Sequence, residues 1–216
     1  PNRKWFNQSM YIPRHFSVSD EIAREFLAKT TSGHLVTNTA DGLRATFIPV
    51  HFRPATDSLI GHLARGNEQW SKSAHGETLF IASTIDSYIS PTWYASKKEH
   101  GKVVPTWDYM MAHIYGELSI HDDVEWLRAA VSELTDSFEQ TRSQPWKVSD
   151  APEDYVAGQL RAIVGVELKV SRLEVSFKMS QNKTKADLDG VIAGLTTDGK
   201  SQIASLVDQL RPDDKK

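Results

Sequence analysis

The dipeptide Asp41-Gly42 is the feature that most constrains how this chain can fold. It stands between two β-prone runs, in the stretch HLVTNTADGLRATFIPVHF. An Asp-Gly pair between such runs is a strong signal for a two-residue hairpin, because that turn needs positive φ angles at its centre. We therefore expect two paired antiparallel strands here, with Pro49 marking an edge, a bulge or the exit of the second strand.

Further β-prone runs follow, and short polar turns join most of them. MMAHIYGELSI alternates most clearly, with Ala112, Ile114 and Leu118 on one face. Because strands follow strands directly, antiparallel pairing is favoured over βαβ crossovers. We expect about eight short strands, namely the two hairpin strands and runs at 59–64, 78–83, 87–94, 110–120, 163–170 and 173–179.

Helical periodicity is strongest at 122–140, where apolar residues recur at three-and-four spacing after two aspartates. Other helices are expected at 19–33, at 152–162 and in the tail from Ala186. The chain should therefore be mainly β with peripheral α-helices (α+β), built on a small antiparallel barrel. The expected divisions are an extension or cloning remnant at 1–9, a barrel domain with inserted helices at 10–180, and a helical tail at 181–216.

Composition excludes several classes of protein. The 216 residues include no cysteine, which rules out disulfides, thiolate metal sites and thiol catalysis. No run approaches the roughly twenty apolar residues of a membrane span, and no apolar signal region opens the chain, so we expect a cytoplasmic protein without membrane contact. The net charge of −3 gives no overall basic excess for nucleic acid. The lysine-rich stretch KKEHGK at 97–102 keeps DNA as a candidate partner.

Metal and hydrolase chemistry find little support in the sequence. His51, His62 and His113 fall on expected strands, but no HxH or HExxH pattern occurs and no carboxylate stands at ligand spacing. Structural or ligand-contacting histidines explain these positions better, so we expect no metal. GxSxG is absent as well, and the sequence identifies no catalytic residue.

Two polar stretches suit an anionic ligand. In GHLARGNEQW, Arg65 and Asn67 occupy a turn that opens a short helix, and a surface loop capped by Asn67 is the alternative. In SFKMSQNKTK, Lys178, Ser180 and Asn182 follow the last strand, and a solvated helix entry capped by Asn182 is the alternative.

The tripeptide PTW occurs twice, at 91–93 and at 105–107, on either side of the lysine-rich stretch. Tryptophan is mostly a core or interface residue, and a planar ligand is the other explanation. We expect Trp93 to pack beneath the loop and Trp107 to face a ligand or dimer cleft.

The order of these motifs resembles the PaiB-like family. MYIPRHF, GHLVTNTADGLRATFIPVHF, GHLARGNEQW, YISPTWY, VPTWDYMMAHIYGEL and FKMSQNKT carry the resemblance, from about Met10 to Leu195. It implies an FMN-binding antiparallel split β-barrel, related to pyridoxamine-phosphate oxidases and flavin reductases, and a homodimer with flavin at the subunit interface. PaiB-like proteins are described as negative transcriptional regulators. The arginine-rich substrate stretch of the oxidases is missing, so that oxidation is not expected.

The resemblance also implies a binding site by position. The flavin ring would lie along the second strand and its phosphate near the third strand and the following turn. The partner subunit would contribute the second PTW region and the last polar cluster. The implied cofactor-binding residues are Ala45, Thr46, Phe47, Ile48, His62, Leu63, Ala64, Arg65, Asn67, Trp107, Tyr109, Lys178, Ser180, Gln181 and Asn182.

Two other functions stay open at this point. A flavin-dependent NAD(P)H oxidoreductase would need no acid or base from the protein, in agreement with the lack of an obvious one. A haem-binding or haem-degrading protein, as found among other split-barrel relatives, would use His62 or His113 as the axial ligand.

Overall fold

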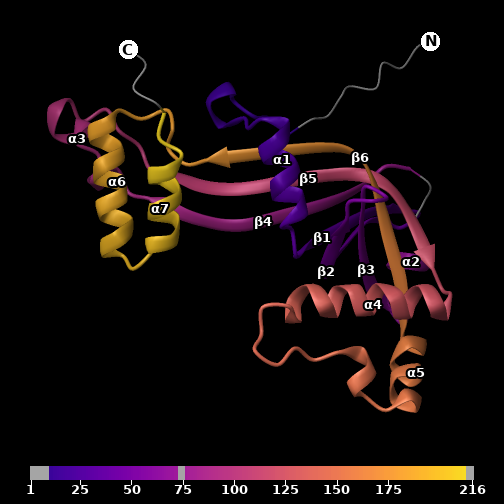
Figure 1. The fold of residues 1–216 in the computed structure, drawn as a ribbon. Helices are drawn as coiled ribbons and strands as arrows, with labels where there is room; N and C mark the ends of the chain where they lie inside the picture. Colours follow the sequence, from indigo (N-terminus) through magenta and orange to yellow (C-terminus); the bar gives the residue numbers. More distant parts are fainter. Residues whose placement is uncertain (1–9, 73–75, 213–216) are drawn as a thin grey trace, which may run out of the picture. The chain divides into compact units, whose positions relative to one another are not determined.

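A computed structural model describes residues 10–72 and 76–212, so the expected extension at 1–9 lies outside the described residues. Six strands form a closed barrel in the order β1-β2-β3-β6-β5-β4 (Figure 1). Every pair with a recorded register is antiparallel. The strands are β1 Ser32–Thr39, β2 Gly42–Arg53, β3 Ser58–Ala64, β4 Thr78–Ile89, β5 Thr106–His121 and β6 Ile163–Lys178.

Helices precede, interrupt and follow these strands, as the periodicity predicts. No helix in the described part of the chain is long and apolar enough to cross a membrane. The α-helices are α1 Asp20–Ala28, α2 Gln69–Lys72, α3 Ser96–Glu99, α4 Val124–Glu139, α5 Glu153–Arg161, α6 Lys185–Thr197 and α7 Ser201–Gln209, and the 3-10 helices are η1 Arg14–Phe16, η2 Pro91–Trp93 and η3 Val148–Asp150.

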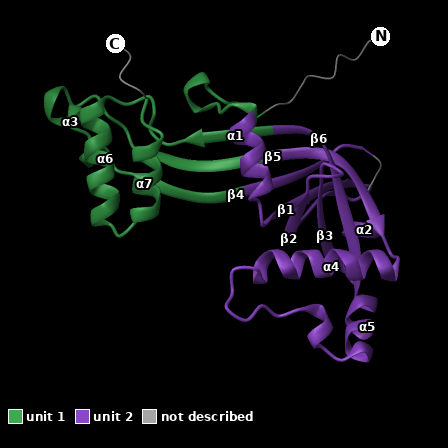
Figure 2. Ribbon diagram, viewed as in Figure 1, with its two compact units in different colours: residues 1–20, 83–112, 174–216 green, residues 21–82, 113–173 purple. Residues whose placement is uncertain are grey.

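The described chain groups into two compact units (Figure 2). Unit 1 contains residues 10–20, 83–112 and 174–212, and unit 2 contains residues 21–72, 76–82 and 113–173. β4, β5 and β6 each run from one unit into the other, so both units are assembled from separated segments. Residue 180, where the sequence suggests the end of a barrel domain, lies inside unit 1.

A hairpin forms between β1 and β2 as expected, but its two turn residues are Ala40 and Asp41, and the positive φ is found only at Gly42, the first residue of β2. The register runs from Ser32 opposite Pro49 to Thr39 opposite Gly42. Gly42 has a φ of 106°, a conformation that glycine adopts without strain. Thr39 Oγ1 donates to the Gly42 carbonyl at 2.7 Å and accepts from the Asp41 N–H at 3.2 Å. Local hydrogen bonds therefore fix the turn, and the turn fixes the register.

The barrel has six long strands where the sequence predicts about eight short ones. β4 joins two expected runs, because Ser83, Thr84 and Asp86 are exposed positions within a continuous strand and do not form a turn. β6 likewise continues through Ser171 and Arg172. Polar residues on the solvent side of a strand resemble a turn in the sequence, which explains why these expected boundaries are wrong.

The two PTW tripeptides lie where strands end and begin. Pro91–Trp93 forms η2, and Ser90 Oγ caps it by accepting from the Thr92 N–H at 3.2 Å. The expected strand at 87–94 therefore stops at Ile89. The second PTW overlaps the start of β5 at Thr106.

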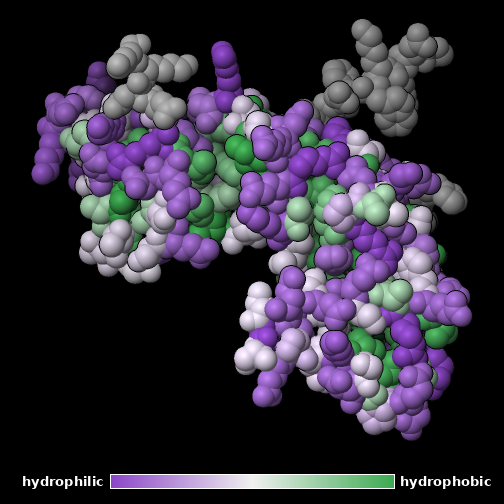
Figure 3. Space-filling view, in the orientation of Figure 1, coloured by the Kyte–Doolittle hydropathy of each residue, from purple (hydrophilic) through white to green (hydrophobic). Residues whose placement is uncertain are grey.

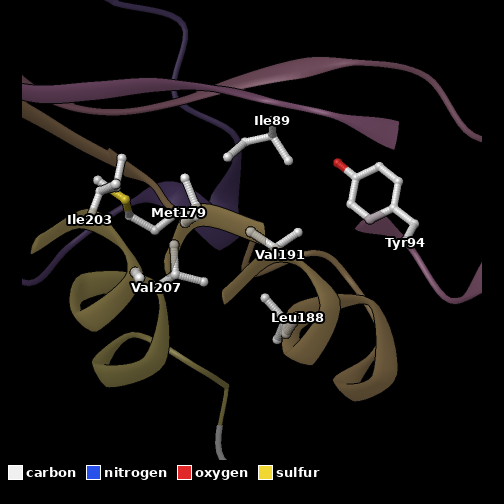
Figure 4. Packing of buried hydrophobic residues seen from close by; sticks show 9 residues of the cluster. Ile89, Tyr94, Met179, Leu188, Val191, Ile203 and Val207 are labelled. Carbon is white, nitrogen blue, oxygen red and sulfur yellow. The ribbon is translucent and has the colours of Figure 1, made fainter. Parts of the chain in front are cut away.

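An apolar core holds unit 1 together (Figure 4). Side chains of α6 and α7 pack there with Ile89, the last residue of β4, and Met179, the residue after β6. Trp93 packs against this cluster, as expected for a structural residue. Burial, assisted by the charge of Asp108, raises the pKa of Tyr94 to about 12. The buried core residues are Ile89, Tyr94, Met179, Leu188, Val191, Leu195, Ile203, Ala204 and Val207.

In unit 2, α4 packs on the strands through one buried face. The helix begins as the paired aspartates predict, with Asp123 Oδ1 accepting from the Trp126 N–H at 2.8 Å. Its Glu133 carboxylate accepts two hydrogen bonds from Arg53 of β2, at 2.6 and 2.8 Å. The Trp126 ring stacks on His121 with a centroid distance of 3.9 Å. α4 is therefore fixed to the sheet by a bidentate ion pair as well as by apolar contacts.

We expect Gly190→Ala to destabilise the protein. A Cβ at Gly190 of α6 would come within 1.9 Å of the Trp93 carbonyl oxygen, which belongs to the backbone and cannot rotate away. The clash should lower the free energy of unfolding by about 1–3 kcal/mol, although alanine is the better helix former. Urea unfolding followed by circular dichroism measures the change.

Gly158→Ala in α5 is the matched control. The nearest atom to a Cβ there is the end of the Arg161 side chain at 3.8 Å. Relief of the glycine penalty should then raise stability by up to about 1 kcal/mol. Equal effects of the two substitutions would show that the Trp93 contact is not the cause.

Candidate functional site

The pairing of β2 with β3 stops part-way along β2. It runs from Arg53 opposite Ser58 to Val50 opposite Gly61, whereas β3 pairs with β6 along its whole length. The half of β2 before Val50 is thus outside the β2–β3 ladder, and its backbone groups on that side are available to other partners. We call this place the β2–β3 split. The expected ring residues at 45–48 and the expected phosphate-end residues at 62–64 lie on its two sides.

The outward surface beside the split is largely apolar. Cross-strand partners share a face, and the register places Phe47 opposite His34 and His34 opposite Ile81. Phe47 is 61% exposed, and its ring meets the His34 ring edge-on at 5.4 Å. Ile48 points the other way, into the core. We call this surface the β2–β1–β4 face, and it consists of His34, Val36, Ala45, Phe47, Leu79 and Ile81.

The turn after β3 returns to β2 and holds it through three side chains. Asn67 Nδ2 donates to Thr46 Oγ1 at 2.9 Å, and Thr46 Oγ1 donates to Gln69 Oε1 at 2.5 Å. The buried Gln69 also donates through Nε2 to the carbonyls of Leu35, at 2.9 Å, and Arg44, at 3.3 Å. Asn67 Oδ1 accepts from the Gln69 N–H at 3.0 Å, so Asn67 does cap α2. Gln69, which belongs to the polar turn noted in the sequence but not to the implied cofactor-binding residues, joins β1, β2 and α2.

Arg65 uses its guanidinium within unit 2. Nε donates to the Arg161 carbonyl at 2.7 Å, and Nη2 donates to the Ile163 carbonyl at 2.9 Å. Arg65 also forms a bidentate ion pair with Asp122, donating from Nη1 and Nη2 to the two carboxylate oxygens. These hydrogen bonds lower the pKa of Asp122. Most N–H groups of Arg65 are therefore occupied. Its role in the structure is to tie the end of β3 to the start of β6.

The His62 side chain faces α4 and α5. It lines a cavity together with Val131 of α4 and with Tyr155 and Leu160 of α5. Burial lowers the pKa of His62, so the imidazole is neutral at pH 7. Its Nδ1 atom has no hydrogen-bond partner among the described residues. On the same strand, Leu63 is buried in the core.

The remaining expected residues belong to unit 1, where several gather around the buried Asp108. Lys178 Nζ donates to Thr106 Oγ1 at 2.8 Å and to the Trp107 carbonyl, and it lies 3.4 Å from Asp108 Oδ1. These acceptors use all three donors of the ammonium group. Ser180 Oγ donates to Asp108 Oδ2 at 2.7 Å. Burial raises the pKa of Asp108, and Ser180 and Lys178 act in the opposite direction.

The turn after β6 is fixed by Gln181. Its Oε1 accepts from the Met179 N–H at 2.7 Å, and its Nε2 donates to the Phe177 carbonyl at 2.5 Å. Asn182 is exposed, and Thr184 caps α6, so the suggestion that Asn182 caps this helix is wrong.

Two aromatic residues complete the expected set in unit 1. Tyr109 places its ring 5.9 Å from Lys178 Nζ. Trp107 is 54% exposed, and its ring meets Tyr88 edge-on at 6.3 Å. The structure thus brings Trp107, Tyr109, Lys178 and Ser180 together within unit 1, and Thr46 with Asn67 within unit 2. A place for Trp107 in a ligand or dimer cleft stays a prediction.

The strand histidines do not form a metal centre in the structure. His51 lies on β2, His62 on β3 and His113 on β5, where it contacts Tyr115. Across residues 10–72 and 76–212, no group of three or more His, Asp or Glu side chains is placed to hold a metal ion.

Comparison with known proteins identifies the family. Residues 10–172 match the family model described as "Putative FMN-binding domain". The chain is also 30% identical over 206 residues to protease synthase and sporulation protein PAI 2 of Bacillus subtilis, covering 92% of this chain and 97% of that protein. This chain belongs to the PaiB-like family of FMN-binding split-barrel proteins.

A further relative and a more distant structure agree with this assignment. An uncharacterized protein of Emericella nidulans is 40% identical over 170 residues, which cover 71% of this chain and 68% of that protein. The FAD and heme binding protein from Mycobacterium smegmatis has the same fold, with a TM-score of 0.56, 15% identity, and coverage of 82% of this chain and 79% of that one. The α+β split barrel expected from the sequence is thereby confirmed.

The PaiB-like site fits a flavin in part. The β2–β3 split offers backbone groups for the polar edge of an isoalloxazine, and Phe47 offers an aromatic surface. The phosphate end is less well served, because Arg65 and Lys178 already contact carboxylates and carbonyls of their own units. The described residues could therefore hold the ring, and they do not assign a place for the phosphate.

We expect Lys178→Met to destabilise the protein strongly, because it leaves the fully buried Asp108 carboxylate without its cation. Breaking one partner of a buried pair costs about 3–5 kcal/mol. Adding Asp108→Asn to the same chain removes the orphaned charge and should restore much of the loss. Urea midpoints of the wild type, the two single variants and the double variant form the cycle, and additive effects would contradict a direct interaction.

Proposed function

We propose that this protein binds FMN at the β2–β3 split as a homodimer and acts as a flavin-linked negative transcriptional regulator of PaiB type. The family match supports flavin binding, and the likeness to PAI 2 over nearly the whole chain supports a regulatory role. The observation that carries the proposal is the end of the β2–β3 ladder at Val50, which frees one backbone edge of β2 beside a largely apolar face.

The protein's part in this proposal is binding and positioning. The backbone at 45–48 would accept and donate hydrogen bonds to the ring, while Phe47 and His34 would cover part of its surface. Gln69 and Asn67 would keep that backbone in place through their contacts with Thr46. Bound FMN would supply the redox chemistry, and the protein would hold and orient it.

A second copy of the chain is the partner that suits the β2–β1–β4 face. Phe47 is 61% exposed, and the other apolar side chains of the β2–β1–β4 face lie beside it. Removing this apolar surface from water would contribute favourably to the free energy of association. A dimer would also exclude water from one side of a ring placed there. Size-exclusion chromatography with light scattering measures the oligomeric state directly.

The geometry at His62 argues against this histidine as a haem ligand. The cavity that this histidine lines has a volume of about 250 Å³. Pockets for cofactors and drug-sized ligands usually measure about 300–1,000 Å³, so a haem macrocycle would not fit without rearrangement.

We expect Ala45→Trp to weaken FMN binding at least tenfold. Ala45 is exposed on the β2–β1–β4 face, and an indole there would occupy the space beside the free backbone edge. Quenching of flavin fluorescence during titration with the protein measures the dissociation constant.

Ala129→Trp, on an exposed position of α4 in the same unit, is the matched control and should leave FMN binding unchanged. If both variants bind FMN like the wild type, the flavin does not lie on this face. If the wild type itself does not bind FMN, flavin binding is excluded as the function.

The lysine-rich stretch is the expected DNA contact of the regulator. Lys97, Lys98 and Lys102 are exposed, and Ser96 holds the start of α3 by donating from N and Oγ to Asp187, each at 2.9 Å. The double variant Lys97→Glu and Lys98→Glu should weaken binding to an upstream genomic fragment. It should also reduce the slope of log K against log salt by about two.

Lys29→Glu combined with Lys169→Glu makes the same change in charge at exposed positions elsewhere and should bind like the wild type. Gel shifts at physiological salt provide the measurement. Retention by the wild type at low salt only, or equal loss in both double variants, would mean non-specific attraction and contradict the regulatory role.

A further inference from the structure

A cavity of about 250 Å³ lies within unit 2, apart from the residues expected to hold the flavin ring. His62 of β3, Val131 of α4 and Ile163 of β6 form part of its wall, and α5 and the η3 region form the rest. Figure 3 shows hydrophobic surface over the region of α4 and α5. The space opens to solvent beside Trp146 and Tyr155, so it is a pocket in the surface and not an interior void.

The lining of the cavity is apolar with few polar groups. Val131, Val148 and Leu160 contribute aliphatic surface, and none of the described residues that line it is Lys, Arg, Asp or Glu. A charged ligand would lose its hydration there without gaining a partner. The lining therefore selects for a neutral molecule and against FMN, whose phosphate is anionic.

Two aromatic residues stand where the cavity meets solvent. Trp146 is 47% exposed and Tyr155 is 59% exposed, although both line the space. Aromatic side chains pack best against other rings, in offset or edge-to-face geometry. A planar ring system is the shape that both side chains could cover as it enters.

The volume limits the ligand to a small one. An apolar cavity of about 150 Å³ holds benzene, and pockets for drug-sized ligands begin near 300 Å³. The volume of about 250 Å³ falls between these limits. It suits one or two fused rings with few substituents.

His62 is the polar group that would orient such a ligand. Its imidazole lines the cavity, and the Nδ1 atom finds no hydrogen-bond partner in the described residues. Burial also disfavours the charged ring, in agreement with a neutral ligand. Nδ1 itself is closed to solvent, so the ring would meet a hydrogen-bonding group of the ligand through Nε2.

We propose that the cavity beside His62 is a second ligand site, which takes a neutral one- or two-ring aromatic molecule carrying one hydrogen-bonding group. The site goes beyond flavin binding and does not depend on it. The proposed ligand differs from FMN in charge and size. Most of the cavity wall comes from α4, α5 and η3. Such a site would let the protein respond to an aromatic metabolite as well as to a flavin.

Calorimetric titration of the full chain with indole tests the proposal, and indene serves as the isosteric probe that lacks the N–H group. The wild type should bind indole at least fivefold more tightly than indene, and indole-3-carboxylate should not bind. In His62→Phe, which keeps a ring but removes the nitrogens, the preference for indole over indene should disappear.

Ala151→Trp fills the cavity from the η3 region and should weaken indole binding at least tenfold, while Ala129→Trp on α4 should not change it. Circular dichroism confirms that each variant is folded. The proposal is overturned if the folded wild type shows no binding of millimolar indole, or if indole binds equally to Ala151→Trp. It is also overturned if His62→Phe keeps the preference for indole. FMN titration of the same samples separates the two ideas, because loss of flavin binding alone contradicts only the proposed function.

Discussion

Backbone hydrogen bonding in a closed barrel is the constraint on which the rest of this structure depends. Each strand needs a partner on both sides, and the first half of β2 lacks the one that β3 provides further along. Gln69 compensates in part by reaching from α2 to the Arg44 carbonyl of β2, and it also binds the Leu35 carbonyl of β1. A helix of four residues has little stability of its own, so this buried amide also explains why α2 forms there. The place where strand pairing ends is consequently the place where a ligand can take over.

Charge in this protein is largely neutralised within each unit. Arg65 pairs with Asp122 and Lys178 with Asp108, and both cations also bind backbone carbonyls. Recognition at the split would then rest on backbone groups and apolar surface more than on fixed positive charge. The exposed lysines of the 97–102 stretch differ in this respect, which makes them the better candidates for contact with a polyanion.

Local signals in the sequence predicted local structure well. The sequence predicts three local features: the hairpin at Asp41-Gly42, the cap at Asp123 and the start of α5 after Pro152. Each of them depends on residues that are close together in the chain. The number of strands was wrong, because exposed polar residues within a strand look like a turn. The network of Gln69 was missed, since Leu35 and Arg44 stand 34 and 25 residues away in the chain. Asp122, the ion-pair partner of Arg65, is 57 residues away in the chain. The sequence therefore shows that Arg65 is a cation but does not show which carboxylate it binds.

The three strands shared by both units affect how the chain can be made. Unit 2 begins near residue 21 and is complete only at residue 173, and unit 1 needs segments from both sides of it. A chain emerging from the ribosome therefore exposes apolar strands such as β1 and β2 long before β6 exists to close the barrel. Neither unit corresponds to a continuous fragment that a single cut could release. Folding of either unit therefore has to wait until most of the chain has been synthesised.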